Sequence, residues 1–450
     1  MRGNIYVFTS AIVAALGGFL FGFDTAVISG VEQAIQRLWE INDFSLGMAV
    51  AIALYGTVIG AMFGGIPANK YGRKKTLFWV GILYLVSAIG SALAPEINSF
   101  MLFRFLGGLG VGASSVAAPM YISELAPAHM RGRLVALFQF NIVLGIVVAY
   151  INNYFMADIG PNAWRFMLGV EAIPALIYSI LVLVIPRSPR WLIVIKGNIE
   201  EARTILAKID PDNVNRAVTA IQGSIYSAST AKRKFFSKKY SFAILLAFSI
   251  AFFNQVAGIN AIIYYAPRIF EMTGLASSSA LISTAGLGLI NLIFTMVGIA
   301  VIDKIGRRSL MFIGSIGLII TLTLVARAFF TDTFGGVPMF LFIYIGFFAM
   351  SQGAVIWVFI SEVFPNEVRA QGQSLGSFTH WMMAAVITNI FPYFTNTFGA
   401  GPVFFFFAFM MVLQLLFVWK IMPETMGKSL EDIEKEFDVK TESLPVPDEF

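Results

Sequence analysis

The amino-acid sequence predicts an all-α integral membrane protein built from two repeats of six membrane-spanning helices. The first observation is composition: the 450-residue chain is 58% hydrophobic and only 13% charged, which is far more apolar than an ordinary soluble domain. The second is repetition, because three unrelated motifs recur at a nearly constant offset. The apolar runs are continuous, so the pattern excludes an outer-membrane β-barrel with its ten-residue alternating segments.

Twelve apolar runs are long enough to cross a bilayer, which takes roughly 20 helical residues. The first run has no small-residue cleavage site after a short apolar segment, so we expect it to be retained and not to act as a signal peptide. We place the spans at 5–30, 44–69, 75–95, 97–120, 132–157, 163–186, 241–272, 277–302, 308–330, 337–361, 370–397 and 401–422.

Basic residues predict the orientation of these spans. The loops on one side hold only Arg37, Arg165, Arg268 and Arg327, and nearly all other lysines and arginines lie on the opposite side. The positive-inside rule therefore places both termini in the cytoplasm. The net charge of +5 follows from this topology and does not indicate nucleic-acid binding. We expect a multi-pass protein of a bacterial inner membrane, surrounded by lipid.

The internal repeat divides the chain. Motifs recur at offsets of 234 residues (Gly72 to Gly306), 238 residues (Ser123 to Ser361) and 237 residues (Pro186 to Pro423). Six spans per repeat make the repeats parallel. The stretch 199–209 has its apolar residues on one face, as in an amphipathic surface helix, and a second helix is expected from Ser429. The expected parts are an N-terminal half (1–186), a cytoplasmic linker with amphipathic helices (187–240), a C-terminal half (241–422) and a cytoplasmic tail (423–450).

Nine motifs in order make the chain resemble the sugar porter family of the major facilitator superfamily, most closely its bacterial proton-coupled monosaccharide symporters, over residues 5–432. The motifs are GGFLFGFDTAVISG, NKYGRKK, RFLGGLGVG, SELAPAHMRG, PRSPRWL, NQVAGIN, DKIGRR, SEVFPNEVRAQG and PET-x-G. The chain departs from the family at five points: Asn254 and His380 stand where relatives have glutamine, Arg187 where they have an acid, Ala354 where they have proline, and Met426 where they have lysine.

Away from their ends, the predicted N-terminal spans hold three charged residues: Asp24, Arg104 and Glu171. A buried charge requires a partner or a proton. The resemblance implies that Asp24 carries a coupling proton and that Arg104 and Glu171 are its coupling partners. The alternative is a static buried ion pair that only fixes helix packing.

A polar stretch at residues 254–267, bracketed by Gly258 and Pro267, predicts an interrupted membrane helix, which is a pointer to a transporter's binding site. Its side-chain amides suit a neutral, hydroxyl-rich ligand, because each amide both donates and accepts hydrogen bonds. The resemblance implies sugar contacts at Gln139, Gln255, Asn260, Asn291 and Trp357. Matching of positions adds Asn254, His380, Trp381, Phe21 and Tyr264.

Two of these residues could have other roles. Trp357 could be a packing or interfacial aromatic instead of a platform for a sugar ring. His380 could bond a hydroxyl, titrate near neutral pH or be a satisfied core histidine.

Acidic and basic residues at matching cytoplasmic ends of the two halves suggest a salt-bridge gate that opens during transport. Its members are Arg73, Glu124, Arg131, Arg190, Arg307, Glu362 and Arg369. Arg187, which replaces the usual acid, should weaken one tie in this network. The alternative is a set of anchors that only hold the topology.

Several other functions are disfavoured. Gly108-x-Gly110-x-Gly112 lies in a membrane span, so we expect helix contact and not a phosphate loop. The chain has no cysteine and two histidines, so neither a disulfide nor a metal site is expected. No nucleophile–base pair or Walker motif indicates an enzyme or ATP drive.

These patterns predict a secondary active transporter for proton-coupled uptake of a monosaccharide, pentose or hexose, or a polyol by alternating access. A facilitative uniporter of the same fold and a non-transporting sugar sensor are the alternatives. We expect no cofactor other than the coupling proton, and a functional monomer.

Overall fold

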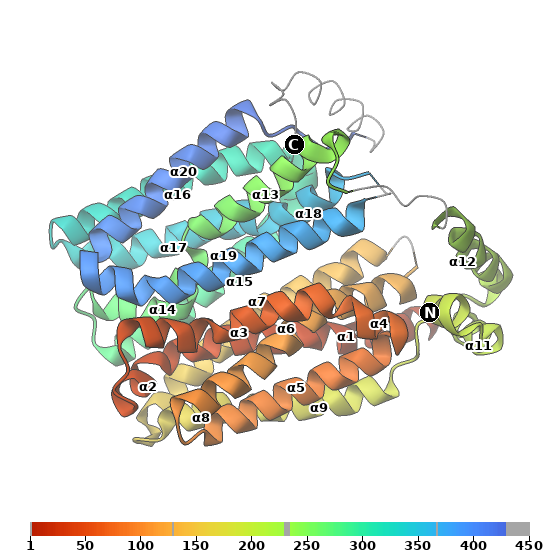
Figure 1. Cartoon of the computed structure of the whole chain (residues 1–450), viewed down its shortest axis with the longest axis horizontal. Coiled ribbons are helices and arrows are strands. Elements are labelled where there is room, and N and C mark those ends of the chain that lie inside the picture. Colours follow the sequence, from red (N-terminus) through yellow and green to blue (C-terminus); the bar gives the residue numbers. More distant parts are fainter. Residues whose placement is uncertain (1, 128–129, 229–234, 366–367, 429–450) are drawn as a thin grey trace. The chain divides into compact units, whose positions relative to one another are not determined.

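The computed structural model describes residues 2–127, 130–228, 235–365 and 368–428. These residues form helices and no strand (Figure 1), which confirms the predicted all-α class. Eleven helices among them are long and apolar enough to cross a membrane. The remaining predicted span, 370–397, coincides with the 30-residue helix α19 (Arg369–Phe398), whose many polar side chains lower its hydropathy. The tail helix predicted from Ser429 lies outside the described residues.

The first half of the chain supplies six predicted spans, a short helix between the first two of them, and three helices that follow the sixth. A 29-residue helix is about 44 Å long, which exceeds the roughly 30 Å apolar core of a bilayer. The helices are α1 (Arg2–Val27), α2 (Glu32–Leu38), α3 (Asp43–Phe63), α4 (Gly65–Lys70), α5 (Arg73–Leu93), α6 (Ile97–Leu125), α7 (Arg131–Met156), α8 (Ala163–Gly169), α9 (Ala172–Val184), α10 (Pro189–Trp191), α11 (Ile199–Ile209) and α12 (Val214–Ala228).

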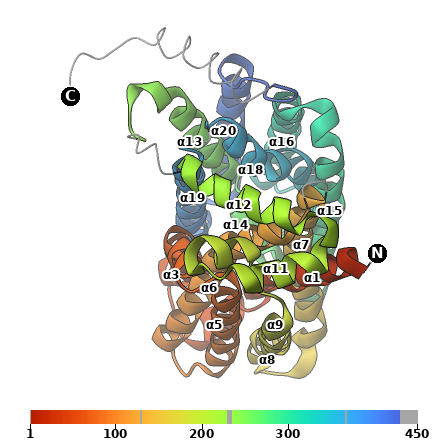
Figure 2. The same ribbon diagram turned by 90° about the vertical axis from the view of Figure 1, so that its right-hand side faces the viewer.

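The predicted amphipathic helix at 199–209 is α11, capped by Asn198, whose side chain accepts a hydrogen bond from the Glu201 N–H. It packs against α1 (Figure 2). The second half of the chain contains α13 (Ser241–Val256), α14 (Ile259–Glu271), α15 (Ser277–Ile305), α16 (Arg307–Phe330), α17 (Val337–Phe348), α18 (Ala354–Glu362), α19 and α20 (Ala400–Lys420).

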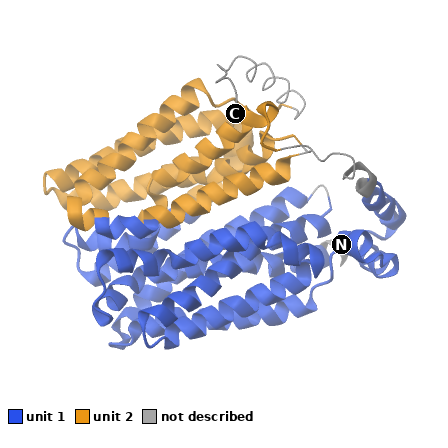
Figure 3. Ribbon diagram, viewed as in Figure 1, with its two compact units in different colours: residues 1–230, 262–292, 388–393 blue, residues 231–261, 293–387, 394–450 orange. Residues whose placement is uncertain are grey.

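Two compact units emerge from the packing of the chain (Figure 3). Unit 1 holds residues 1–230, 262–292 and 388–393, and unit 2 holds residues 231–261, 293–387 and 394–450. Three helices, α14, α15 and α19, therefore contribute residues to both units.

Small residues let the helices of unit 1 approach closely. A Cβ on Gly108 of α6 would lie 1.9 Å from the Ala53 carbonyl oxygen of α3, and one on Gly22 of α1 would lie 1.8 Å from the Ile142 oxygen of α7. Neither position tolerates a side chain without moving backbone. The expectation that the glycines at 108–112 serve helix contact is confirmed.

The seventh predicted span is interrupted where the sequence predicts it. Helix α13 ends at Val256, Gly258 takes a φ of +86° that favours glycine, and α14 begins at Ile259. The Tyr344 hydroxyl donates to the Ala257 carbonyl at 2.9 Å, so the break does not leave that group unpaired. A second irregularity is the π-helical turn Ala349–Gly353 between α17 and α18, a feature that often marks functional sites.

Candidate functional site

The N-terminal half buries an ion pair at the position the sequence predicts. The Arg104 guanidinium on α6 donates to a carboxylate oxygen of Asp24 on α1 and, at 2.9 Å, to the Asp24 main-chain carbonyl. Both side chains are about 1% exposed. Two helices are thus joined by a charge pair that water does not reach, an arrangement that depends on both partners being present.

Glu171 completes this cluster without sharing its hydrogen bonds. It is 1% exposed and lies within electrostatic reach of both Asp24 and Arg104. Its Oε1 has no hydrogen-bond partner among the described residues. The structure therefore brings all three predicted coupling residues together inside unit 1, with two carboxyl groups for one guanidinium.

Hydroxyl groups line the same region, and sequence reasoning missed them. Tyr84 lies near Asp24, Glu171 and Tyr178, and Ser87 approaches Asp24 across Gly107. The hydroxyls of Tyr84, Ser87 and Tyr178 are buried with no partner among the described residues. Their only sequence signal is a polar atom within a predicted span, which carries no charge and is common in membrane helices.

Unit 2 holds a cluster of neutral amides around the interruption between α13 and α14. Gln255 Nε2 donates to Asn254 Oδ1 at 2.9 Å, and Asn260 Nδ2 donates to Gln255 Oε1 at 2.7 Å. Gln255 Nε2 also lies 3.2 Å from His380 Nδ1. The broken helix thus gathers three amides that bond to one another through Gln255, which also meets His380, and none of these four residues is an acid.

Aromatic rings flank the amide cluster. His380 lies 4.9 Å from the Trp357 ring and 4.6 Å from the Trp381 ring, measured between centroids. Trp357 remains 37% exposed, whereas His380 and Trp381 are each 9% exposed. An aromatic face beside hydrogen-bonding amides is the usual composition of a sugar site, because the apolar face of a pyranose stacks on the ring.

Gln352 is a further member of this cluster that the sequence analysis did not single out. Its carbonyl oxygen accepts a hydrogen bond from Asn254 Nδ2 at 3.3 Å, and its buried Oε1 has no partner among the described residues. It lies in the π-helical turn Ala349–Gly353. The available signal was an amide directly before Gly353 within an apolar run.

The remaining four predicted sugar contacts belong to unit 1. Phe21 on α1, Tyr264 on α14 and Asn291 on α15 are buried, and Gln139 on α7 is partly buried. Helices α7 and α14 are joined by a hydrogen bond from the Tyr150 hydroxyl to the Ile263 carbonyl, 2.9 Å long.

Matching arginine clusters lie at the ends of the spans in both halves. In the first arginine cluster, Arg73 pairs with Glu124 at 2.8 Å, and the Ser188 hydroxyl donates to the same carboxylate at 2.6 Å. In the second arginine cluster, Arg307 pairs with Glu362 at 2.7 Å, and Thr425 donates to that carboxylate at 2.7 Å. Each pair lies within one unit.

The other three predicted gate residues have no carboxylate partner among the described residues. Arg369 donates to the Phe364 carbonyl at 3.3 Å, and Arg131 and Arg190 are exposed. Arg187, the departure from the family motif, contacts Glu201 on α11 at 3.3 Å, with its side chain 50% exposed.

A second buried ion pair in unit 1 was not foreseen. Arg268 on α14 donates to Glu32 on α2 at 2.6 and 2.9 Å and to Gln36 at 2.6 Å. Burial raises the pKa of Glu32 from 4.5 to about 7, although the positive charges of Arg268 and Arg37 act in the opposite direction. Each residue alone looks like a loop charge, so the sequence gives no hint that they meet.

Comparison with known proteins identifies the family. The family model described as "Sugar (and other) transporter" matches residues 10–437. The chain belongs to this family. It is 37% identical to the D-xylose-proton symporter of Escherichia coli (strain K12), over 97% of this chain and 96% of that protein. It is 34% identical to the arabinose-proton symporter of Bacillus subtilis (strain 168), over 96% and 95% of the two chains.

Solved structures agree with this family assignment. The inward-open xylose transporter XylE from E. coli matches with a TM-score of 0.86 and 34% identity, over 96% of this chain and 99% of that one. Its partially occluded inward-open form matches with a TM-score of 0.84. These matches confirm the predicted major facilitator fold.

Proposed function

We propose that this protein imports a monosaccharide together with a proton, and that Asp24 carries the proton. The observation that supports this most directly is the buried Asp24–Arg104 pair with Glu171 beside it. A carboxylate this deeply buried is costly unless it is paired or protonated. The relatives named above include proton symporters for xylose and arabinose, which supports proton coupling here.

The coupling follows from the charges. Ionised Asp24 holds Arg104 and joins α1 to α6, and protonation removes the charge that keeps this pair together. Arg104 then has the nearby Glu171 carboxylate as its alternative partner. Protonation thus changes which helix packing is preferred, and the sugar binds the packing so selected.

The sugar contacts that we propose are Gln255, Asn260 and Trp357, with Asn254, His380 and Trp381 beside them. Phe21, Gln139, Tyr264 and Asn291 are the further sugar contacts that we propose. The amides bond to one another, so a sugar hydroxyl would replace bonds that already exist. Replacement of an amide partner by a hydroxyl is close to neutral in hydrogen bonds, which permits release as well as binding.

The remaining assignments extend this proposal. Both termini face the cytoplasm of a bacterial cell, the two six-span halves rock about the sugar, and one chain suffices for transport. The arginine clusters at the span ends act as the cytoplasmic gate, with Arg73–Glu124 and Arg307–Glu362 as its closed ion pairs. A potential of ~100 mV contributes about 2.3 kcal/mol per proton, equivalent to about 50-fold sugar accumulation.

The deciding experiment is the external pH of lightly buffered, de-energised cells on addition of xylose, arabinose, glucose, galactose or myo-inositol. We expect alkalinisation with one of these compounds in the wild type and none in Asp24→Asn. If labelled sugar equilibrates with no change of pH, the protein is a uniporter. If labelled sugar binds but never crosses, it is a sensor, and transport as a whole is excluded.

A further inference from the structure

The two halves differ at one position in otherwise matching arginine clusters. Ser188 and Thr425 occupy equivalent places and donate to equivalent carboxylates, Glu124 and Glu362. The residue before each is Arg187 in the first half and Glu424 in the second. The second repeat thus has an acidic residue at this position, and the first repeat has a basic one.

Glu424 shows what the acid does. Its carboxylate accepts hydrogen bonds from the backbone N–H groups of Arg307 at 2.9 Å and Arg308 at 3.0 Å. These are the first two residues of α16, which follows Gly306 with a φ of +92°. A carboxylate therefore neutralises the positive end of this helix and the arginines beside it.

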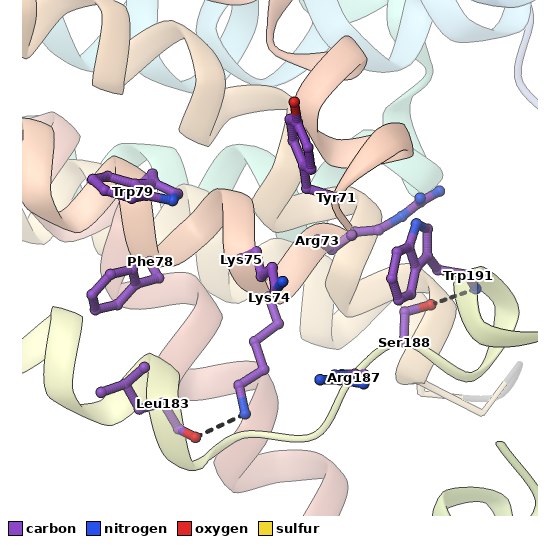
Figure 4. Close-up of a pocket in the computed structure, with 11 residues that line it drawn as sticks. Tyr71, Arg73, Lys74, Lys75, Phe78, Trp79, Leu183, Arg187, Ser188 and Trp191 are labelled. Carbon is purple, nitrogen blue, oxygen red and sulfur yellow. Dashed lines mark hydrogen bonds between the residues drawn. The ribbon is translucent and has the colours of Figure 1, made fainter. Parts of the chain in front are cut away.

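The first half has the same backbone but lacks the anion. Helix α5 begins at Arg73 after Gly72, whose φ is +93°. No described atom accepts a hydrogen bond from the N–H groups of Arg73 or Lys74, because Arg187, which stands where Glu424 stands in the second half, is a cation that cannot accept one. Arg187 instead contacts Glu201 on α11. A cavity of about 360 Å³ borders these residues (Figure 4).

The cavity wall is cationic. Arg73, Lys74, Lys75 and Arg187 are among the described residues that line it, and none of those residues is acidic. The Arg73 side chain is 9% exposed, yet its Nε has no hydrogen-bond partner among the described residues. Its two terminal nitrogens donate to the Ala68 carbonyl at 3.0 Å and to Glu124 at 2.8 Å, so Arg73 is already paired within its own cluster, and the other cations on the cavity wall are Lys74, Lys75 and Arg187.

The rim of the cavity is apolar and lies on membrane-spanning helices. Trp79 of α5 is 63% exposed and Leu183 of α9 is 57% exposed, and both line the cavity with Phe78 (Figure 4). Tryptophan concentrates at the headgroup level of a bilayer, where its ring is amphipathic. The rim therefore combines an exposed tryptophan with exposed apolar side chains beside the cationic wall.

We propose that this cavity binds the phosphate group of an anionic phospholipid. The phosphate takes the place that the Glu424 carboxylate fills in the second half, beside the start of α5. Arg187, Lys74 and Lys75 supply the positive charge, and Trp79 and Leu183 contact the glycerol and acyl region. The lipid thus completes the first arginine cluster from outside, in a chain whose own acid is replaced by Arg187.

The test is lipid binding to the purified full-length protein in detergent, measured by native mass spectrometry with phosphatidylglycerol, phosphatidylcholine or inorganic phosphate. We expect the wild type to bind phosphatidylglycerol at least tenfold more tightly than phosphatidylcholine. Arg187→Gln should lose about tenfold of the phosphatidylglycerol affinity. Arg187→Glu should lose the preference altogether, because the new carboxylate can cap α5 as Glu424 caps α16.

The matched control is Lys304→Gln, which removes the same charge from an exposed residue at the end of α15 and should bind lipid as the wild type does. An equal loss in Lys304→Gln would mean general charge attraction and overturn the site. Competition by inorganic phosphate with no preference between the two lipids would overturn the lipid assignment. If Arg187→Glu still preferred phosphatidylglycerol to phosphatidylcholine, the lipid would not bind in this cavity. None of these readings depends on transport.

Discussion

The two units solve the problem of burying polar groups in opposite ways. Unit 1 buries charges: Asp24, Arg104 and Glu171 are each about 1% exposed, and Glu171 Oε1 remains unpartnered among the described residues. Unit 2 buries neutral amides, and Asn254, Gln255 and Asn260 bond to one another in sequence. Charge responds strongly to a proton, whereas a neutral amide does not.

This contrast suggests a division of labour. The charged cluster is suited to couple a proton to helix packing, and the amide cluster is suited to recognise hydroxyl groups without titrating. Substitutions in the two clusters should therefore fail in different ways, and that difference can be measured.

The largest effect is expected for Asp24→Asn. An amide cannot release a proton, so net accumulation should fall to about the external concentration, a loss of about 50-fold at ~100 mV. Exchange of labelled sugar across the membrane should persist, because it needs no net proton movement. The measurement is uphill uptake beside counterflow in the same vesicles. Uphill uptake by Asp24→Asn would show that Asp24 does not carry the coupling proton. The proposed division of roles between unit 1 and unit 2 would then be wrong.

The reverse pattern is expected for Gln255→Ala. This change leaves Asn260 Nδ2 and Asn254 Oδ1 without their partner, and a lost charge-free hydrogen bond of this kind costs about 1–3 kcal/mol. We expect KM for the sugar to rise about 10- to 100-fold while the proton-to-sugar ratio stays unchanged. A changed ratio with unchanged KM would instead assign Gln255 to coupling. Kinetics of labelled uptake with parallel pH recording give both quantities.

The sequence predicted helix positions well because long apolar runs and their polar ends are local features. The predicted span 97–120 is α6 at Ile97–Leu125, and 277–302 is α15 at Ser277–Ile305. The family motifs also brought Asp24 and Arg104 into one expected cluster, 80 positions apart. Both successes rest on patterns that a single sequence displays.

The failures share a different cause. Glu32 and Arg268 lie 236 positions apart, and only the fold of α14 against α2 makes them a buried pair. Gln352 depends on a π-helical turn that has no clear sequence signature. Arg369 sits at a helix start like Arg307, yet within the described part of the chain it contacts the Phe364 carbonyl and no carboxylate, because side-chain direction is set by packing.

The ion pair between Glu32 and Arg268, which lies outside the membrane-spanning part of α1, should make the stability of unit 1 depend on pH. Burial raises the pKa of Glu32 from 4.5 to about 7. Glu32 therefore binds a proton more readily when α2 packs against α14 than when this contact is lost. The contribution of Glu32 to the stability of the folded protein is therefore fully present below pH 4.5 and is lost as pH rises through about 7. Glu271 and Arg37 also act on Glu32, in opposite directions.

Thermal unfolding between pH 5 and 8 checks this. The Tm of the wild type should fall as pH rises toward 8, and Glu32→Gln should flatten that slope. Glu40→Gln, which removes an exposed acid just after α2, is the control and should keep the wild-type slope. A parallel slope in Glu32→Gln and the wild type would show that this pair does not titrate in the range.

The smallest effect is expected for Asn254→Gln, which introduces the residue that the family resemblance implies at this position. The amide is kept, so the neutral character of the cluster is unchanged, but one extra methylene enters a site that is 2% exposed. Added volume in a packed site usually costs about 1–3 kcal/mol, part of which the flexible glutamine relieves. We expect KM to change less than about tenfold, with a different order of preference among pentoses and hexoses and unaltered proton coupling. Unchanged preference across xylose, arabinose, glucose and galactose would show that Asn254 only supports Gln255, and would move the choice of sugar to His380.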